Sequence, residues 1–290
     1  MTLREPQGQP EHGRGLIDLH LHTTASDGRC SPSELVDVAA RAGVTVMAAT
    51  DHDTTGGLDE VRSRASERGI DVVTGIEITA VEKGLDVHVL GYFFDPADAI
   101  LQAFLVAQRA SRIVRIEAIG NRLVTLGYPV DVAAIVADAR QAGARAIGRP
   151  QIARAMVAAG YVADVQEAFT RWLGSGCPAF VPRVGPSIES VIQTIHDARG
   201  LASLAHPGRT RIDDRIDALH EAGLDAVEAF HSDHGPEESD RYLQRALRVG
   251  LLVTGGSDFH GDPARALTPG STSLPHAHWT ILSEARCRYA

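Results

Sequence analysis

Six short strings that carry histidine, a carboxylate residue or both recur along this chain, each attached to an apolar run typical of a β-strand. They are Asp-Leu-His20-Leu-His22, Thr-Asp-His52-Asp, Gly-Ile-Glu77-Ile-Thr, Asp-Val-His88-Val-Leu-Gly-Tyr, Leu-Ala-His206-Pro-Gly and Gly-Gly-Ser-Asp258-Phe-His260-Gly. Six such strings supply enough neutral nitrogen and anionic oxygen for more than one metal ion. The pattern therefore predicts a fold in which ligand-bearing strand ends meet around a multinuclear metal site.

Two strings give the most direct arguments for metal ligands. Residues two apart on a strand point to the same face, so His20 and His22 can reach one ion. Glu77 lies inside an apolar run, and burying a carboxylate there is costly unless a partner compensates its charge. A metal ion is the simplest such partner.

The other strings add donors from loops. Asp27 is either a hard oxygen ligand or a turn residue before a glycine. His52 lies between Asp51 and Asp53, and either carboxylate could hold its second ring nitrogen. Three further residues complete the set: His206, Asp258 and His260. Imidazole and carboxylate ligands without thiolates suit manganese, iron or zinc rather than a structural zinc site.

Strand-like and helix-like runs alternate through most of the chain. The strand-like runs are 16–22, 44–50, 72–78, 86–93, 201–205, 226–229 and 251–255. The helix-like runs are 33–42, 57–68, 187–198, 213–222 and 237–249. The first helix has a capping signal in which Ser31 is the N-cap, Pro32 the first helical residue and Glu34 the reciprocal partner. Such alternation predicts a mostly parallel α/β sheet, open or closed, and ligands at strand ends favour a closed barrel.

Residues 99–185 interrupt this alternation. The apolar spacing predicts one long amphipathic helix over 101–127, followed by shorter helices at 130–141, 151–159 and 165–173. We therefore expect a disordered leader at 1–15, a barrel domain built from 16–98 and 186–290, and a mostly helical insertion at 99–185 that caps the barrel mouth.

Charge is unevenly distributed. The net charge of −9 divides into −9 for residues 1–100, +4 for 101–189 and −4 for 190–290. An acidic body with a basic middle suits a protein that binds cations in one part and anions in another. Ordinary compositional drift in an arginine-rich chain explains the same numbers.

Composition excludes several classes. No apolar run approaches the roughly 18–20 residues that cross a bilayer, and the N-terminus lacks the apolar region of a signal peptide. Three scattered thiols, Cys30, Cys177 and Cys287, form no CxxC pair and argue against a disulfide framework. The expectation is a monomer in the cytoplasm without a membrane partner.

The ordered strings HxH, TDHDT, GIEIT, HVLGYFFD, AHPGR and GSDFHG resemble the polymerase and histidinol phosphatase (PHP) superfamily, specifically its TrpH/YciV-like branch. The resemblance covers about residues 16–262. It implies a distorted (β/α)7 barrel with a helical insertion and up to three divalent ions, manganese first, with iron or zinc as alternatives. It implies His20, His22, Glu77 and Asp258 for the first ion, Asp27, His52 and His260 for the second, and Glu77, His88 and His206 for the third.

The same resemblance implies a hydrolase. Its branch removes phosphate from nucleoside 3′,5′-bisphosphates and trims short RNA or DNA from the 5′ end. Metal ions lower the pKa of water so that hydroxide can attack the phosphorus near neutral pH. A histidinol-phosphate-type monoester phosphatase is the second enzymatic interpretation, and a non-catalytic PHP binding module is the third.

Substrate contacts are expected from basic residues near helix starts and strand ends. Arg149 precedes Pro150 at a helix start, where guanidinium and backbone N–H groups together bind phosphate. The other candidates are Arg209, Arg183, His231 and His234. This chain has Gln151 where the resembled branch usually has histidine, so a leaving-group contact from that position is not carried over.

Three arginines of the long helix, Arg112, Arg115 and Arg122, fall at near-heptad spacing on one face. We expect an exposed solubilising stripe; a track for a polynucleotide backbone is the alternative. Aromatic residues, which stack single-stranded bases, do not alternate with these arginines.

Overall fold

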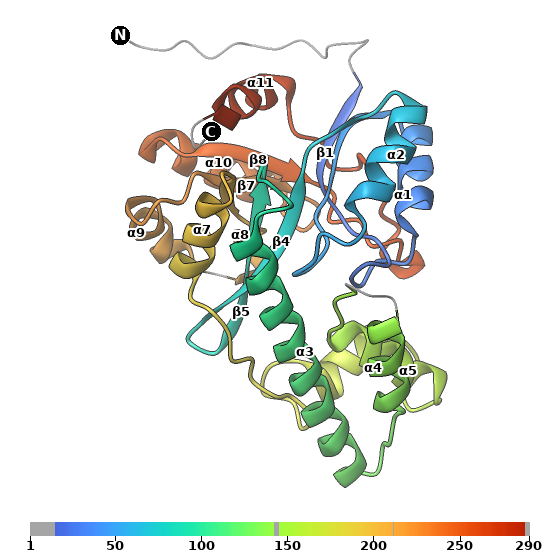
Figure 1. Cartoon of the computed structure of the whole chain (residues 1–290). Coiled ribbons are helices and arrows are strands. Elements are labelled where there is room, and N and C mark those ends of the chain that lie inside the picture. Colours follow the sequence, from blue (N-terminus) through green and yellow to red (C-terminus); the bar gives the residue numbers. More distant parts are fainter. Residues whose placement is uncertain (1–14, 142–144, 211, 288–290) are drawn as a thin grey trace.

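The computed structural model describes residues 15–141, 145–210 and 212–287 (Figure 1). The predicted leader, apart from its last residue, lies outside these ranges. Each strand-like run predicted from the sequence forms a strand, and the run at 72–78 divides in two. The strands are β1 (Leu16–Leu21), β2 (Val44–Ala49), β3 (Asp71–Val72), β4 (Gly75–Glu82), β5 (Leu85–Tyr92), β6 (Leu201–Leu204), β7 (Ala226–His231) and β8 (Leu252–Gly256).

The strands form two sheets, ordered β1-β2-β3 and β4-β5-β6-β7-β8. Most pairs are parallel, as predicted, but β5 runs antiparallel to both neighbours. Lys83 and Gly84 cause this reversal, because both have positive φ angles, as a tight two-residue hairpin requires. Single parallel bridges, Leu21 with Phe259 and His52 with Glu77, connect the two sheets. The closed (β/α)7 barrel stays a prediction.

Helices cover the sheets. They are α1 (Pro32–Arg41), α2 (Leu58–Arg68), α7 (Ile188–Asp197), α8 (Pro207–Thr210), α9 (Ile216–Glu221), α10 (Pro236–Val249) and α11 (His276–Glu284). The predicted capping box is confirmed: Ser31 accepts from the Glu34 N–H, and Glu34 accepts from the Ser31 N–H. The sequence reading missed α11, whose polar, proline-flanked sequence gives little periodicity. Apolar residues of both sheets and of several of these helices, α11 among them, share one large core.

Residues 99–185, called here the helical segment, pack differently. Their helices are α3 (Ala99–Thr125), α4 (Val132–Gln141), α5 (Arg149–Ala158) and α6 (Val165–Ala168), followed by a π-helical turn at Phe169–Leu173. Figure 1 shows α3 running away from the sheets, with α4 and α5 beside its C-terminal half. A second hydrophobic core joins these elements to one another. Its status as a separate domain stays a prediction.

The expected exposed arginine stripe on α3 is wrong for two of its three members. Arg112 is buried and donates to Asp53 and Thr79 of the sheet region. Arg115 is largely covered, since it donates to Asp86 and to a backbone carbonyl near the end of the helical segment. This face of α3 therefore packs against polar groups of strands β4 and β5 and of nearby loops instead of facing water. Among the described residues, no helix is both long and apolar enough to cross a membrane.

Candidate metal centre

The side chain of Glu77 is the centre of the histidine cluster. It projects from β4 and is almost completely buried. Its Oε1 lies 2.7 Å from Nδ1 of His88 and 3.1 Å from Nε2 of His206. Its Oε2 lies 3.1–3.4 Å from three further imidazole nitrogens, those of His20, His22 and His52. One carboxylate therefore faces five imidazoles, a geometry suited to bridging ions.

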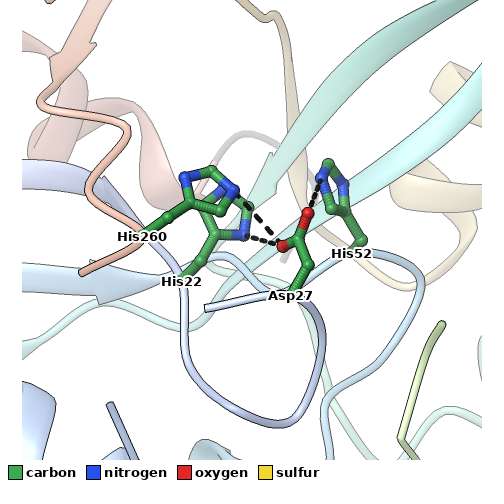
Figure 2. A group of neighbouring side chains, drawn as sticks. All are labelled: His22, Asp27, His52 and His260. Atoms are coloured by element: carbon green, nitrogen blue, oxygen red, sulfur yellow. Dashed lines mark ion pairs between the residues drawn. The ribbon is translucent and has the colours of Figure 1, made fainter. Parts of the chain in front are cut away.

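A second carboxylate, Asp27, faces the same cluster from the loop after β1 (Figure 2). Its oxygens lie 3.2 Å from His260, 3.7 Å from His52 and 3.8 Å from His22. These four residues offer ligand atoms that all lie within 4.8 Å of one another. We call them the Asp27 group.

Asp258 completes the cluster from the loop after β8. Its Oδ1 lies 3.3 Å from Nε2 of His22 and 3.5 Å from Nε2 of His20. All nine residues predicted as ligands thus lie in one contiguous cluster. His20, Glu77 and His88 belong to strands β1, β4 and β5, and the other six lie in loops that follow strands. The groups of neighbouring side chains differ from the ligand sets predicted for the three ions. His22 lies with the Asp27 group, and His52 lies with Glu77 and His88.

Unpartnered polar atoms test whether this cluster fits metal ions. Buried side-chain atoms normally have hydrogen-bond partners. Within the described residues, several buried atoms of the cluster side chains have no hydrogen-bond partner: Nε2 of His20, both ring nitrogens of His22, Nδ1 of His52, Nδ1 of His206 and Oε2 of Glu77. Neutral imidazole nitrogens and carboxylate oxygens are the donors that divalent transition metals accept. The cluster fits divalent metal ions, and the assignment of each ligand stays a prediction.

Burial sets the protonation of two histidines. It lowers the pKa of His52 to about 3 and that of His206 to about 4. Both imidazoles are therefore neutral at pH 7 and can donate a lone pair to a cation. Burial also opposes charge on Asp27, but its contacts with the neighbouring rings of His260 and His52 hold the pKa of its carboxyl well below the usual value.

The sequence reading missed Glu228, which lies in β7 and is completely buried. Its Oε1 lies 2.9 Å from Nδ1 of His20, and its Oε2 accepts from the backbone N–H of His206 at 2.8 Å. His206 has a φ of 27°, a strained conformation that such a bond helps to hold. The signal that identified Glu77, a carboxylate inside an apolar strand, also applies to Glu228.

Asp51 and Asp53 do not hold the second nitrogen of His52 as suggested. Asp51 accepts from the backbone and hydroxyl of Thr23 and from the hydroxyl of Ser26, so it shapes the loop before Asp27. Asp53 turns away into an ion pair with the helical segment. The nitrogens of His52 instead face Glu77 and Asp27.

Two arginines lie beside Asp258. The half-exposed Arg209 places Nη1 3.4 Å from Asp258 Oδ2 and 3.4 Å from Asp233. Arg265, which the sequence reading missed, pairs with Asp233 at 2.7 Å and lies 3.6 Å from the same oxygen of Asp258. The predicted Arg209 is therefore placed at the edge of the cluster.

Arg149 lies against Asp86. Its Nη2 is 3.0 Å from Asp86 Oδ2, which Arg115 also contacts at 2.9 Å, and its guanidinium lies over the rings of Phe169 and Phe180. Asp86 precedes His88 by two residues on β5, so their side chains share one face of the strand. Arg149, Arg115 and Asp86 therefore lie beside the histidine cluster.

The other predicted substrate contacts have internal partners. Arg183 is buried and pairs with Asp53. His234 places Nδ1 3.1 Å from the Ala229 carbonyl oxygen and accepts from the Gly208 N–H at its other nitrogen. These two positions hold the local structure.

His231 is buried and accepts from the Asp233 N–H at Nδ1. A proton is then left on Nε2, which lies 3.4 Å from Asp258 and has no hydrogen-bond partner in the described part of the chain. His231 therefore faces the cluster as a donor, and its contact with substrate stays a prediction.

Comparison with known proteins agrees with this geometry. A family model described as the PHP domain matches residues 18–127. A 5′-3′ exoribonuclease of Haemophilus influenzae is 37% identical over 250 residues, covering 84% of this chain and 89% of the relative. A 3′,5′-nucleoside bisphosphate phosphatase of Chromobacterium violaceum is 35% identical over 251 residues, covering 84% and 87%.

A solved structure from Bifidobacterium adolescentis, assigned as a metal-dependent phosphoesterase, superposes with a TM-score of 0.83 at 34% identity. It covers 92% of this chain and 94% of the other. The fold, the site and these relatives define a metal-dependent hydrolase of phosphate esters. The chain belongs to the PHP family.

Proposed function

We propose that this protein removes a phosphate from nucleotides that carry a second phosphate, in the manner of a nucleoside 3′,5′-bisphosphate phosphatase, and trims short oligonucleotides from the 5′ end. The observation that carries the proposal is the buried cluster around Glu77, in which imidazole and carboxylate atoms lack hydrogen-bond partners from residues 15–141, 145–210 and 212–287. The activities for which the two relatives are named support the choice of nucleotide substrates.

We assign the nine clustered residues as ligands of up to three divalent ions, manganese being the expected metal. When bound, such ions lower the pKa of water and draw negative charge from phosphoryl oxygens. Residues of the chain itself orient the ligand side chains. Glu228 fixes His20 through its Nδ1, which directs Nε2 of that ring to the cluster.

Two arginine groups supply the anion sites. Arg209 and Arg265 flank Asp258, next to the expected metals, and suit the phosphate that is cleaved. Arg149 and Arg115 share Asp86, and the buried Nη2 of Arg115 has no hydrogen-bond partner in the described parts of the chain. Two guanidiniums that share one carboxylate leave net positive charge for a second phosphate.

A phosphate-release assay tests this function. Protein loaded with Mn²⁺ would be incubated with a nucleoside 3′,5′-bisphosphate, a nucleoside 5′-monophosphate and histidinol phosphate. We expect the highest kcat/KM on the bisphosphate. A preference for histidinol phosphate would favour the alternative phosphatase, and metal binding without turnover of any ester would favour a binding module.

The monomeric state stays a prediction.

A further inference from the structure

The loop that carries Asp27 is bound by the helical segment at three consecutive carbonyl groups. The Ala25 carbonyl accepts from the Ala146 N–H at 2.9 Å. The Ser26 carbonyl accepts from Nε2 of Gln151 at 3.0 Å, and the Asp27 carbonyl accepts from Nη1 of Arg154 at 3.3 Å. The backbone on both sides of the Asp27 Cα is therefore held from outside the sheet region.

Helix α5 is built for this contact. Gln151 and Arg154 are three residues apart, so they lie on the same face of the helix. The neighbouring Ile152, Ala153 and Met156 are buried in the core of the helical segment, which fixes the helix behind them. The amide of Gln151 is also oriented, because its Oε1 accepts from the Gly148 N–H at 2.8 Å and its Nε2 must then face the loop.

The other side of the Asp27 group is held by the sheets. The N–H of His22 donates to the Phe259 carbonyl, and the Arg29 N–H donates to the His260 carbonyl. These bonds hold His22 and His260 without the helical segment. Asp27 thus differs from these two histidines, because the carbonyls around it bond to the helical segment.

We propose that Gln151 and Arg154 are positioning residues through which the helical segment sets the metal affinity of the Asp27 group. This inference rests on the assignment of that group as a metal site. It also gives Gln151 a role of its own at the position where the resembled branch usually has histidine. Loss of these bonds releases the Asp27 carboxylate from the geometry that a cation needs, while the ligands around Glu77 keep theirs.

The test is a Mn²⁺ titration of the full-length protein, with free Mn²⁺ measured by electron paramagnetic resonance. Gln151→Glu keeps the acceptor for Gly148 but removes the donor to Ser26, and Arg154→Met removes the donor to Asp27. Each variant should weaken one class of Mn²⁺ site by about 10-fold, the lower end of the effect expected for residues that orient metal ligands. The remaining Mn²⁺ should bind as in the unaltered protein.

Matched controls make the same chemical changes elsewhere on the helical segment. Gln166 is exposed and donates to Thr170, and Arg171 is exposed and pairs with Glu167. Gln166→Glu and Arg171→Met should leave the whole Mn²⁺ isotherm unchanged. An equal loss in these controls would show a general effect of charge and overturn the proposal.

Hydrogen exchange gives a second readout that does not depend on activity. Because linkage is reciprocal, Mn²⁺ bound by the Asp27 group should slow exchange of the Ala146 amide, which donates to the loop. This protection should be smaller in Gln151→Glu. Unchanged Mn²⁺ affinity in both variants, or equal weakening of every Mn²⁺ site, would overturn the proposal. Absence of Mn²⁺ binding to the unaltered protein would refute the metal assignment itself.

Discussion

Buried charged side chains have different partners in the histidine cluster around Glu77 and at the border between the sheets and the helical segment. In the histidine cluster, Glu77 and its histidines leave buried nitrogen and oxygen atoms that have no hydrogen-bond partner among the residues the structure describes. At the border, Asp53 is completely buried and pairs with both Arg112 and Arg183. The first arrangement leaves donor atoms that an ion can bind, whereas in the second the Asp53 carboxylate is neutralised by arginines of the chain itself.

This difference distinguishes side chains that can bind a ligand from side chains that hold the structure around them. Asp53 also accepts from the Thr79 N–H and follows His52 directly, so its ion pairs fix the loop that carries a candidate ligand. A charged residue near a metal cluster is thus not a ligand by proximity alone. The presence or absence of an internal partner is the useful criterion, and mutations on the two sides should have different consequences.

The largest effect is expected in the histidine cluster around Glu77. Asp258→Ala should lower phosphatase kcat/KM by about 10³-fold, because a lost metal ligand removes several kcal/mol of charge stabilisation. Mn²⁺ content, measured by mass spectrometry, should fall in the same variant. Thermal unfolding of the metal-free protein should show no large loss of stability. Normal metal content with normal activity would contradict the assignment of Asp258.

Mutation of the Asp53 ion pairs should instead lower the stability of the fold. Asp53→Asn leaves Arg112 and Arg183 buried without a counter-charge, and burial already lowers the pKa of Arg183 to about 10. Breaking such a buried pair should reduce the free energy of unfolding by about 3–5 kcal/mol, measured by denaturant titration. Glu167→Gln, which alters an exposed ion pair of the helical segment, is the control and should change it little. Equal stabilities of the two variants would remove the distinction drawn here.

Arg149 lies between these two extremes, because it has an internal partner but shares that partner with Arg115. Arg149→Ala should lower kcat/KM on a 3′,5′-bisphosphate by about 10- to 150-fold, the equivalent of a charge-assisted contact of roughly 1.5–3 kcal/mol. A substrate that carries only the cleaved phosphate should be almost unaffected. Equal losses on both substrates would show that Arg149 serves the reacting phosphate or the fold.

Local sequence patterns predicted the clustered residues well. Each candidate ligand stands at or just after a strand, so the alternation of apolar runs was enough to bring His20, Glu77 and Asp258 together. The partners of the arginines were not predictable in this way. Asp53 pairs with Arg112 and Arg183 at separations of 59 and 130 residues, and no local periodicity encodes which buried carboxylate such an arginine will meet.

The smallest effect is expected at Glu228, whose carboxylate contacts two residues of the cluster. Its two oxygens face His20 Nδ1 and accept from the His206 backbone N–H. Nε2 of His20 can bind a metal ion only when the ring proton is on Nδ1. The Glu228 carboxylate favours this tautomer, because it accepts a hydrogen bond from Nδ1–H. Glutamine offers one acceptor and one donor, so either orientation of its amide loses one of these two bonds.

Glu228→Gln should therefore weaken Mn²⁺ binding by about 10-fold, with kcat/KM reduced at low Mn²⁺ and largely restored at high Mn²⁺. Glu237→Gln, the same change at an exposed position on α10, should leave both quantities unaltered. Restoration by excess metal distinguishes an orienting residue from a ligand such as Asp258, because the ligand set of Glu228→Gln is intact. If excess Mn²⁺ does not restore activity, Glu228 has a more direct part in the reaction than orientation of His20.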